Sequence, residues 1–138
     1  MTTLWAGAYA LGAALEGWWD ARQGELPYAG SALLMLIGWW GTGHPLGPAL
    51  LGRLGWTVLL LAPLVPAWWR ERIGAGDLAT VAAITMGLGS AAGALSLWGA
   101  LFGAWAWWRW RRPTVVPLGP FLWGIATILV LVASWSRQ

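Results

Sequence analysis

The chain has 138 residues, of which 59% are hydrophobic and only 9% charged, and its formal net charge is +3. Soluble domains carry about 25% charged residues, so this composition argues against a water-soluble globule. The absence of cysteine excludes thiol catalysis, disulfides and cysteine-based metal sites, and the one histidine, His44, cannot form a metal cluster alone. The length allows one domain over residues 1–138, and fifteen tryptophans and twenty glycines are typical of membrane helices.

Five apolar stretches follow one another along the chain, and the fourth is long enough to fold back on itself. At ~1.5 Å per residue the stretch 78–108 would reach roughly 46 Å, well beyond a hydrocarbon layer of ~30 Å. It forms either one long tilted helix or two shorter ones joined by a turn near Gly87–Ser90. The second arrangement, which we favour, predicts six segments: 4–19, 28–42, 49–69, about 78–88, about 91–108, and 118–136.

The arginines favour six segments over five. All eight basic residues are arginine, and they lie near segment ends, which indicates topology signals and argues against a nucleic-acid surface. With six segments, one side of the membrane receives most of them and is assigned to the cytoplasm. We therefore expect an all-α, polytopic integral protein of the prokaryotic cytoplasmic membrane, with both termini outside and membrane lipids around it. The arginines of the cytoplasmic side would be Arg22, Arg70, Arg72, Arg109, Arg111 and Arg112.

Tryptophan and proline mark the limits of the segments. Paired tryptophans at 18–19, 39–40, 68–69 and 107–108 stand at segment ends, as lipid anchors in an interfacial aromatic belt would. Pro63 and Pro66 lie inside the third segment and predict a kink there, because proline cannot donate a helical hydrogen bond.

The two aspartates, Asp20 and Asp77, are the candidate catalytic pair. In the six-segment arrangement both lie at the cytoplasmic boundary. Aspartyl proteolysis needs one carboxylate to accept a proton from water and one protonated carboxyl to polarise the scissile carbonyl, and two close carboxyls share a proton in this way. Gly74 and Gly76 remove side-chain bulk beside Asp77 and let an extended substrate approach. The alternative is that Asp77 only caps the following helix, and that Asp20 is an ordinary interfacial residue.

Three short motifs resemble those of prepilin peptidases, the integral-membrane aspartyl proteases of type IV pilus, archaellum and type II secretion systems. Gly74-Ala75-Gly76-Asp77 resembles their GxGD region. Asp20, followed by Arg22 and by Leu26-Pro27, resembles their first motif. The stretch 117–122, Pro-Leu-Gly-Pro-Phe-Leu, resembles their late P-x-GP-F-L segment.

The resemblance implies an endopeptidase that removes the leader of prepilin-like substrates at the cytoplasmic membrane face, without metal or organic cofactor. Asp20 and Asp77 would be the catalytic pair, and Pro117, Gly119 and Pro120 would be structural neighbours of the site. Larger family members carry an N-terminal portion, often with zinc-binding cysteine pairs, that is associated with N-methylation. Because this chain has no cysteine, we expect a short, peptidase-only form.

Two features keep other functions open. Glu16 lies one helical turn before Asp20, where it could tune the pKa of Asp20, or it could couple protons in a small membrane transporter. The family usually has lysine two positions after the motif aspartate, whereas this chain has Ala79, as a catalytically inactive relative acting as a scaffold would. Arg22 is a further possible neighbour of the site.

Overall fold

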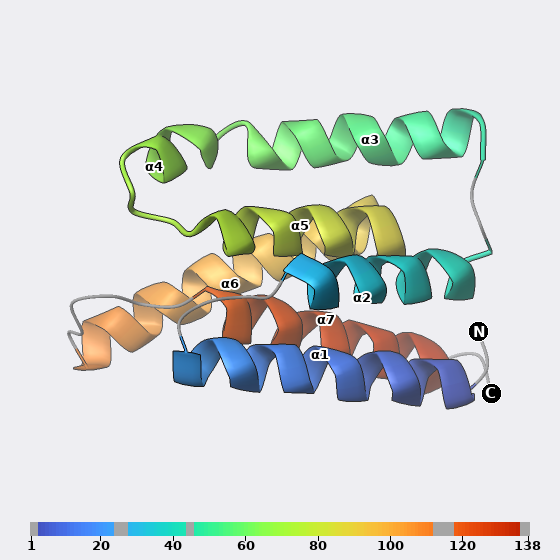
Figure 1. The fold of residues 1–138 in the computed structure, drawn as a ribbon. Helices are drawn as coiled ribbons and strands as arrows, with labels where there is room; N and C mark the ends of the chain where they lie inside the picture. Colours follow the sequence, from blue (N-terminus) through green and yellow to red (C-terminus); the bar gives the residue numbers. More distant parts are fainter. Residues whose placement is uncertain (1–2, 24–27, 44–45, 112–117, 136–138) are drawn as a thin grey trace.

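The computed structural model describes residues 3–23, 28–43, 46–111 and 118–135. Within these ranges every regular element is an α-helix, and the helices lie roughly along one direction (Figure 1). Their bounds are α1 (Thr3–Gln23), α2 (Tyr28–Gly41), α3 (Pro48–Leu61), α4 (Val65–Trp69), α5 (Ala75–Leu88), α6 (Ser90–Arg111) and α7 (Gly119–Trp135).

The predicted polytopic membrane architecture is wrong. In the described part of the chain, no helix combines the length and the apolarity that a membrane crossing requires. Three helices have only 14 residues and would reach ~21 Å, against a hydrocarbon layer of ~30 Å. The longer α1 includes Glu16, Asp20 and Arg22, and α6 ends in an arginine-containing turn. The prediction of an integral membrane localisation with both termini outside is therefore not supported.

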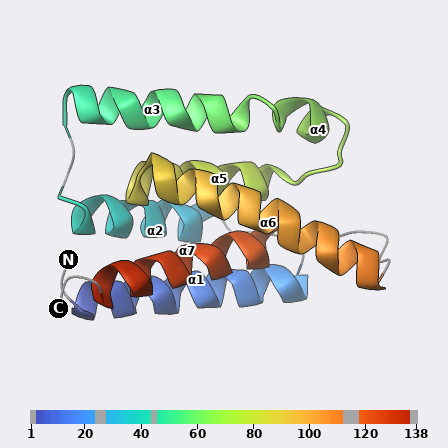
Figure 2. The ribbon, with the colours of Figure 1, turned by 180° about the vertical axis from the view of Figure 1, so that it is seen from behind.

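The helices pack in three layers (Figures 1 and 2). α1 and α7 lie side by side in one outer layer, α2 and α5 form the middle, and α3 with α4 covers the other side. α6 packs against both α5 and α7. The centre is apolar, with Tyr9, Ile84, Leu122 and Trp123 among its largest fully buried side chains. This arrangement brings the end of α1 and the starts of α5 and α7 to the same end of the bundle.

Glycine and proline divide the helices as the sequence predicts. α5 ends at Leu88 and α6 begins at Ser90, and Gly89 between them has a φ of 110°, a conformation that favours glycine. The predicted fold-back near Gly87–Ser90 is thus confirmed. The kink expected at Pro63 is a complete break, because α3 ends at Leu61 and α4 begins at Val65.

The closest approach of α2 and α5 is made by two glycines. A Cβ at Gly87 would lie 2.9 Å from the carbonyl oxygen of Met35, and one at Gly38 would lie 3.0 Å from the backbone carbon of Gly87. Both neighbours are backbone atoms, which cannot move aside as a flexible side chain can. The two helices therefore need glycine at this crossing.

Gly87→Ala is expected to lower the free energy of unfolding by about 2 kcal/mol, because overpacking pushes α2 and α5 apart. Gly55→Ala is the matched control, since a Cβ there meets nothing within 4 Å. In an exposed helix interior that change should stabilise by up to about 1 kcal/mol. Denaturant unfolding of both variants checks the contrast, and equal effects at the two positions would contradict the proposed close packing.

Candidate active site

Asp20 is held at the end of α1 by the packing of α1 on α7. Gly17 lies one turn earlier, and a Cβ there would be 3.5 Å from the Cα of Pro120 and 3.6 Å from the Cβ of Trp123. This close contact places the last turns of α1 beside the first turn of α7. Asp20 is only 5% exposed, and its Oδ2 atom is buried without a hydrogen-bond partner among the described residues.

Asp77 lies in the first turn of α5. The backbone N–H of Gly74, the N-cap residue, donates a hydrogen bond of 3.3 Å to Oδ2 of Asp77. A carboxylate in the first turn satisfies a free N–H group and interacts favourably with the positive end of the helix dipole. The capping role considered above for Asp77 is therefore present, and the side chain remains partly exposed.

Gly119 connects the two aspartates. It is the first residue of α7, where the N–H groups have no partner within the helix. Its backbone lies close enough to Asp20 and to Asp77 to lower the pKa of each carboxyl. Two residues 57 positions apart in the sequence thus lie beside the same residue of α7. The positive ends of two helices, α5 and α7, converge on the pair.

Burial and mutual repulsion oppose this influence of Gly119. Burial is the largest influence on Asp77, followed by the nearby charge of Asp20, and together they raise the pKa of Asp77 to about 6. Burial also raises the pKa of Asp20. The charge of Asp20 thus makes Asp77 harder to ionise, and the two carboxyls titrate as an interacting pair.

The raised pKa values predict that the protein loses stability as pH rises. An unfolded aspartate titrates near pH 3.9, and Asp77 in the folded protein titrates at about 6, so the folded state holds the proton more tightly. Stability is therefore fully present below about pH 4 and falls as pH rises through 6, by roughly 2 kcal/mol for this group. Urea unfolding between pH 4 and pH 7 checks the slope. In Asp77→Asn the decline should be smaller; an unchanged slope would contradict the assignment.

Glu16 lies one helical turn before Asp20 on α1, and its side chain is directed toward α2. Its carboxylate lies against Gly30, where any side chain would collide with it. Its Oε2 atom is buried without a hydrogen-bond partner in the described ranges, and burial, followed by the charge of Asp20, raises its pKa. The charge of Asp20 therefore acts on Glu16. Across the described chain, no group of three or more potential metal-ligating side chains is close enough to hold a metal ion.

The other residues named from the sequence lie around the pair or away from it. Arg22 is exposed and stacks on Trp18, with its guanidinium carbon 4.6 Å from the ring centroid. Pro120 contacts α1 at Gly17. Pro117 lies outside the described residues. Ala79 is two positions after Asp77, and residues with that spacing do not share a helix face. A lysine at position 79 would therefore point away from the Asp77 side of α5.

A polar cluster at the other end of the bundle was not anticipated. Arg53 of α3 donates hydrogen bonds of 2.6 Å to the Met86 carbonyl and 2.9 Å to the Gly87 carbonyl. It also donates to Oγ1 of Thr42, which itself donates to the Gly87 carbonyl at 3.0 Å. From its position near a segment end, Arg53 is predicted only to be a topology signal. Its contacts close the C-terminal end of α5, where a cation suits the helix dipole.

Comparisons of the chain with protein-family models, with curated proteins and with solved structures find no match.

Proposed function

We propose that the protein is an aspartic endopeptidase that uses Asp20 and Asp77 to cleave the leader of prepilin-like substrates. The observation that carries the proposal is the proximity of the two carboxyls: both lie beside the Gly119 backbone, and the charge of Asp20 raises the pKa of Asp77. In the proposed reaction the two neighbouring carboxyls act on one water molecule. Gly119 belongs to the late Gly-Pro motif, so described residues from each of the three motifs that resemble the family lie near this point.

The chemistry follows from one proton shared by the pair. The deprotonated carboxylate accepts a proton from water as the water oxygen bonds to the scissile carbonyl carbon. The protonated carboxyl gives its proton to the carbonyl oxygen, which forms a neutral tetrahedral gem-diol. The C–N bond then breaks, the amine leaves with one proton, and the pair regains the singly protonated state. Because the proton belongs to the pair, neither aspartate is assigned as permanent acid or base.

The surroundings of the pair support an extended substrate with an apolar continuation. Asp77 is partly exposed, and the backbone before it contains no side-chain bulk at Gly74 or Gly76. The neighbouring turns of α1 expose the aromatic side chains of Trp18 and Trp19. A leader junction could lie along the glycine loop while the apolar stem that follows contacts these rings. This substrate class rests on the motif resemblance.

Incubation of the purified chain with a synthetic prepilin-type peptide, followed by mass spectrometry, tests the proposal. We expect one cut, after the glycine that precedes the apolar stem, and no effect of a metal chelator. Glu71→Gln is the matched control, because Glu71 is an exposed carboxyl in the connection before α5. Absence of cleavage between pH 5 and pH 7 would favour the inactive-relative alternative raised by Ala79.

A further inference from the structure

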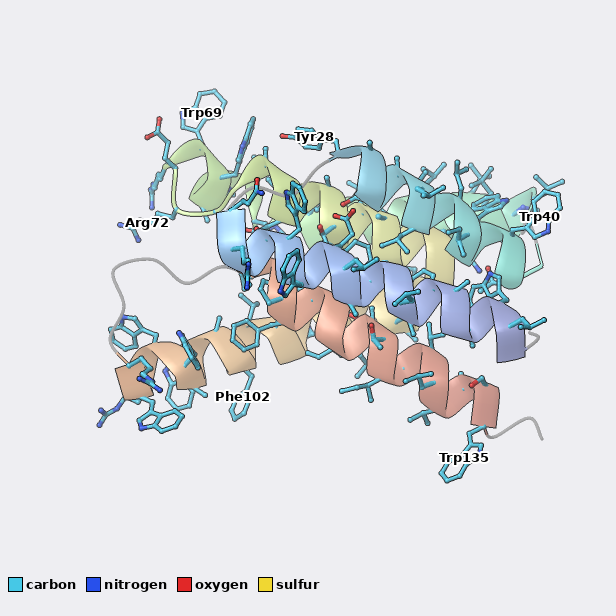
Figure 3. The ribbon with its side chains drawn as sticks, turned by 60° about the horizontal axis from the view of Figure 1, so that its bottom comes forward. Tyr28, Trp40, Trp69, Arg72, Phe102 and Trp135 are labelled. Atoms are coloured by element: carbon cyan, nitrogen blue, oxygen red, sulfur yellow. The ribbon has the colours of Figure 1, made fainter. Side chains whose placement is uncertain are left out.

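One end of the bundle combines exposed tryptophan with exposed arginine. We call it the tryptophan–arginine end; it consists of residues 18–22 at the end of α1, residues 68–72 in and after α4, and residues 105–111 at the end of α6. The three pieces lie at the same end in Figures 1 and 2, and α6 extends beyond its neighbours there. Trp69 and Arg72 are labelled at this end in Figure 3.

The end of α6 combines exposed tryptophan and exposed arginine over residues 105–111. All of residues 105–111 are exposed, and Trp110 is 77% exposed. The guanidinium carbon of Arg111 lies 5.2 Å from the ring centroid of Trp110 and 5.7 Å from that of Trp107. The aromatic rings and the cations thus form one mixed surface. Further back along the helix, Phe102 is exposed as well, so an apolar strip follows the aromatic turn.

The other two pieces repeat this chemistry. Trp18 is exposed and supports Arg22 on its ring. Trp69 is 79% exposed, next to the exposed Arg70. The one exposed acidic side chain described at this end is Glu71, against five exposed arginines. The surface is therefore cationic and aromatic together.

At the opposite end of the bundle, the described exposed tryptophans are not accompanied by an exposed arginine. Trp40 and Trp135 are 71% and 81% exposed there, so exposed tryptophan alone is not distinctive (Figure 3). However, Arg53, the arginine described near that end, is directed at the carbonyls of Met86 and Gly87 and is not a free surface cation. In the described chain, exposed tryptophan and exposed arginine coincide only at the tryptophan–arginine end.

We infer that the tryptophan–arginine end docks onto an anionic lipid surface. Indole rings prefer the headgroup level of a membrane, and arginine is attracted to anionic phosphates there. Exposed apolar side chains behind the rings suit this partner better than a nucleic acid, which needs a polar basic face. Docking would be peripheral and end-on. Asp20 and Asp77 lie at the same end, so a substrate with its stem in the lipid would reach them, although the inference does not depend on cleavage.

Flotation of the full chain with vesicles tests the inference. We expect binding to phosphatidylcholine vesicles that contain phosphatidylglycerol, much weaker binding to phosphatidylcholine alone, and weakening by salt. Arg109→Gln with Arg111→Gln should reduce binding to the anionic vesicles about 30-fold, since each arginine near such a surface contributes about 1 kcal/mol. Asp77→Asn should bind like the wild type, which separates lipid docking from the proposed peptidase activity.

A pair of tryptophan variants tests which end docks. Trp110→Ala should weaken vesicle binding about ten-fold, the effect of taking one large apolar side chain away from the interface. Trp135→Ala, at the other end, should leave it unchanged. Equal binding to neutral and anionic vesicles, equal effects of the two tryptophan variants, or tighter binding to an oligonucleotide than to anionic vesicles would each overturn the inference.

Discussion

Asp77→Asn and Asp20→Asn are each expected to reduce leader cleavage by about 10³-fold or more, the scale of losing a positioned acid or base. Asparagine keeps the size of the side chain but can neither accept nor supply the proton. Because the two carboxyls act as one unit through a shared proton, the double variant should be no worse than either single variant. Cleavage rates on the same prepilin-type peptide measure all three.

Folding controls separate this loss from a damaged structure. Removing a buried, repelled carboxylate should leave the fold intact and raise the free energy of unfolding at pH 7, since Asp77 titrates at about 6 in the folded protein. A variant that is both inactive and less stable would point to capping by Asp77 as its main role. Cleavage that survives either substitution would exclude the pair as the catalytic group.

Arg53→Leu is expected to cause the largest loss of stability, about 3 kcal/mol, because hydrogen bonds to a charged group are among the strongest and two carbonyls would each lose one such bond. The affected carbonyls belong to Met86 and Gly87, at the end of α5 and beside its crossing with α2. Thr42 would keep its own bond to Gly87 but lose the bond from Arg53. Denaturant unfolding gives the change directly.

Arg70→Leu serves as the matched control. Arg70 is exposed, so replacing it should change the free energy of unfolding by less than about 0.5 kcal/mol. If Arg53→Leu were as mild as Arg70→Leu, the cluster would contribute little, and the end of α5 would be held by the packing of the neighbouring helices.

Two helix boundaries could be predicted from the type of residue that stands at each break. Gly89 and Pro63 interrupt the helices because of their own backbone chemistry, so both breaks could be predicted without tertiary information. Membrane spanning could not be judged in the same way. The apolar composition suggested long spans, but turns and short helices divide those stretches, and the finished helices fail on length or on apolarity.

The residues of the candidate site could be predicted from the sequence, but their contacts could not. Asp20 and Asp77 stood out because the chain has no other aspartate. That both would lie beside the Gly119 backbone depends on how α1 packs against α7, which no local pattern encodes. The structural role of Arg53 was not predicted for a related reason. Its partners are backbone carbonyls 33 and 34 residues away, and because every residue has a carbonyl, residue types do not identify such partners.

The central claim is that Asp20 and Asp77 are electrostatically coupled, and it can be measured without substrate. Because they are the only aspartates, labelling aspartate with ¹³C at the carboxyl carbon gives two NMR signals to follow with pH. We expect one midpoint at about 6, and a lower midpoint for Asp77 in the Asp20→Asn variant, since the charge of Asp20 raises it. Two midpoints near the ordinary value of about 3.9, unaffected by that substitution, would contradict the account.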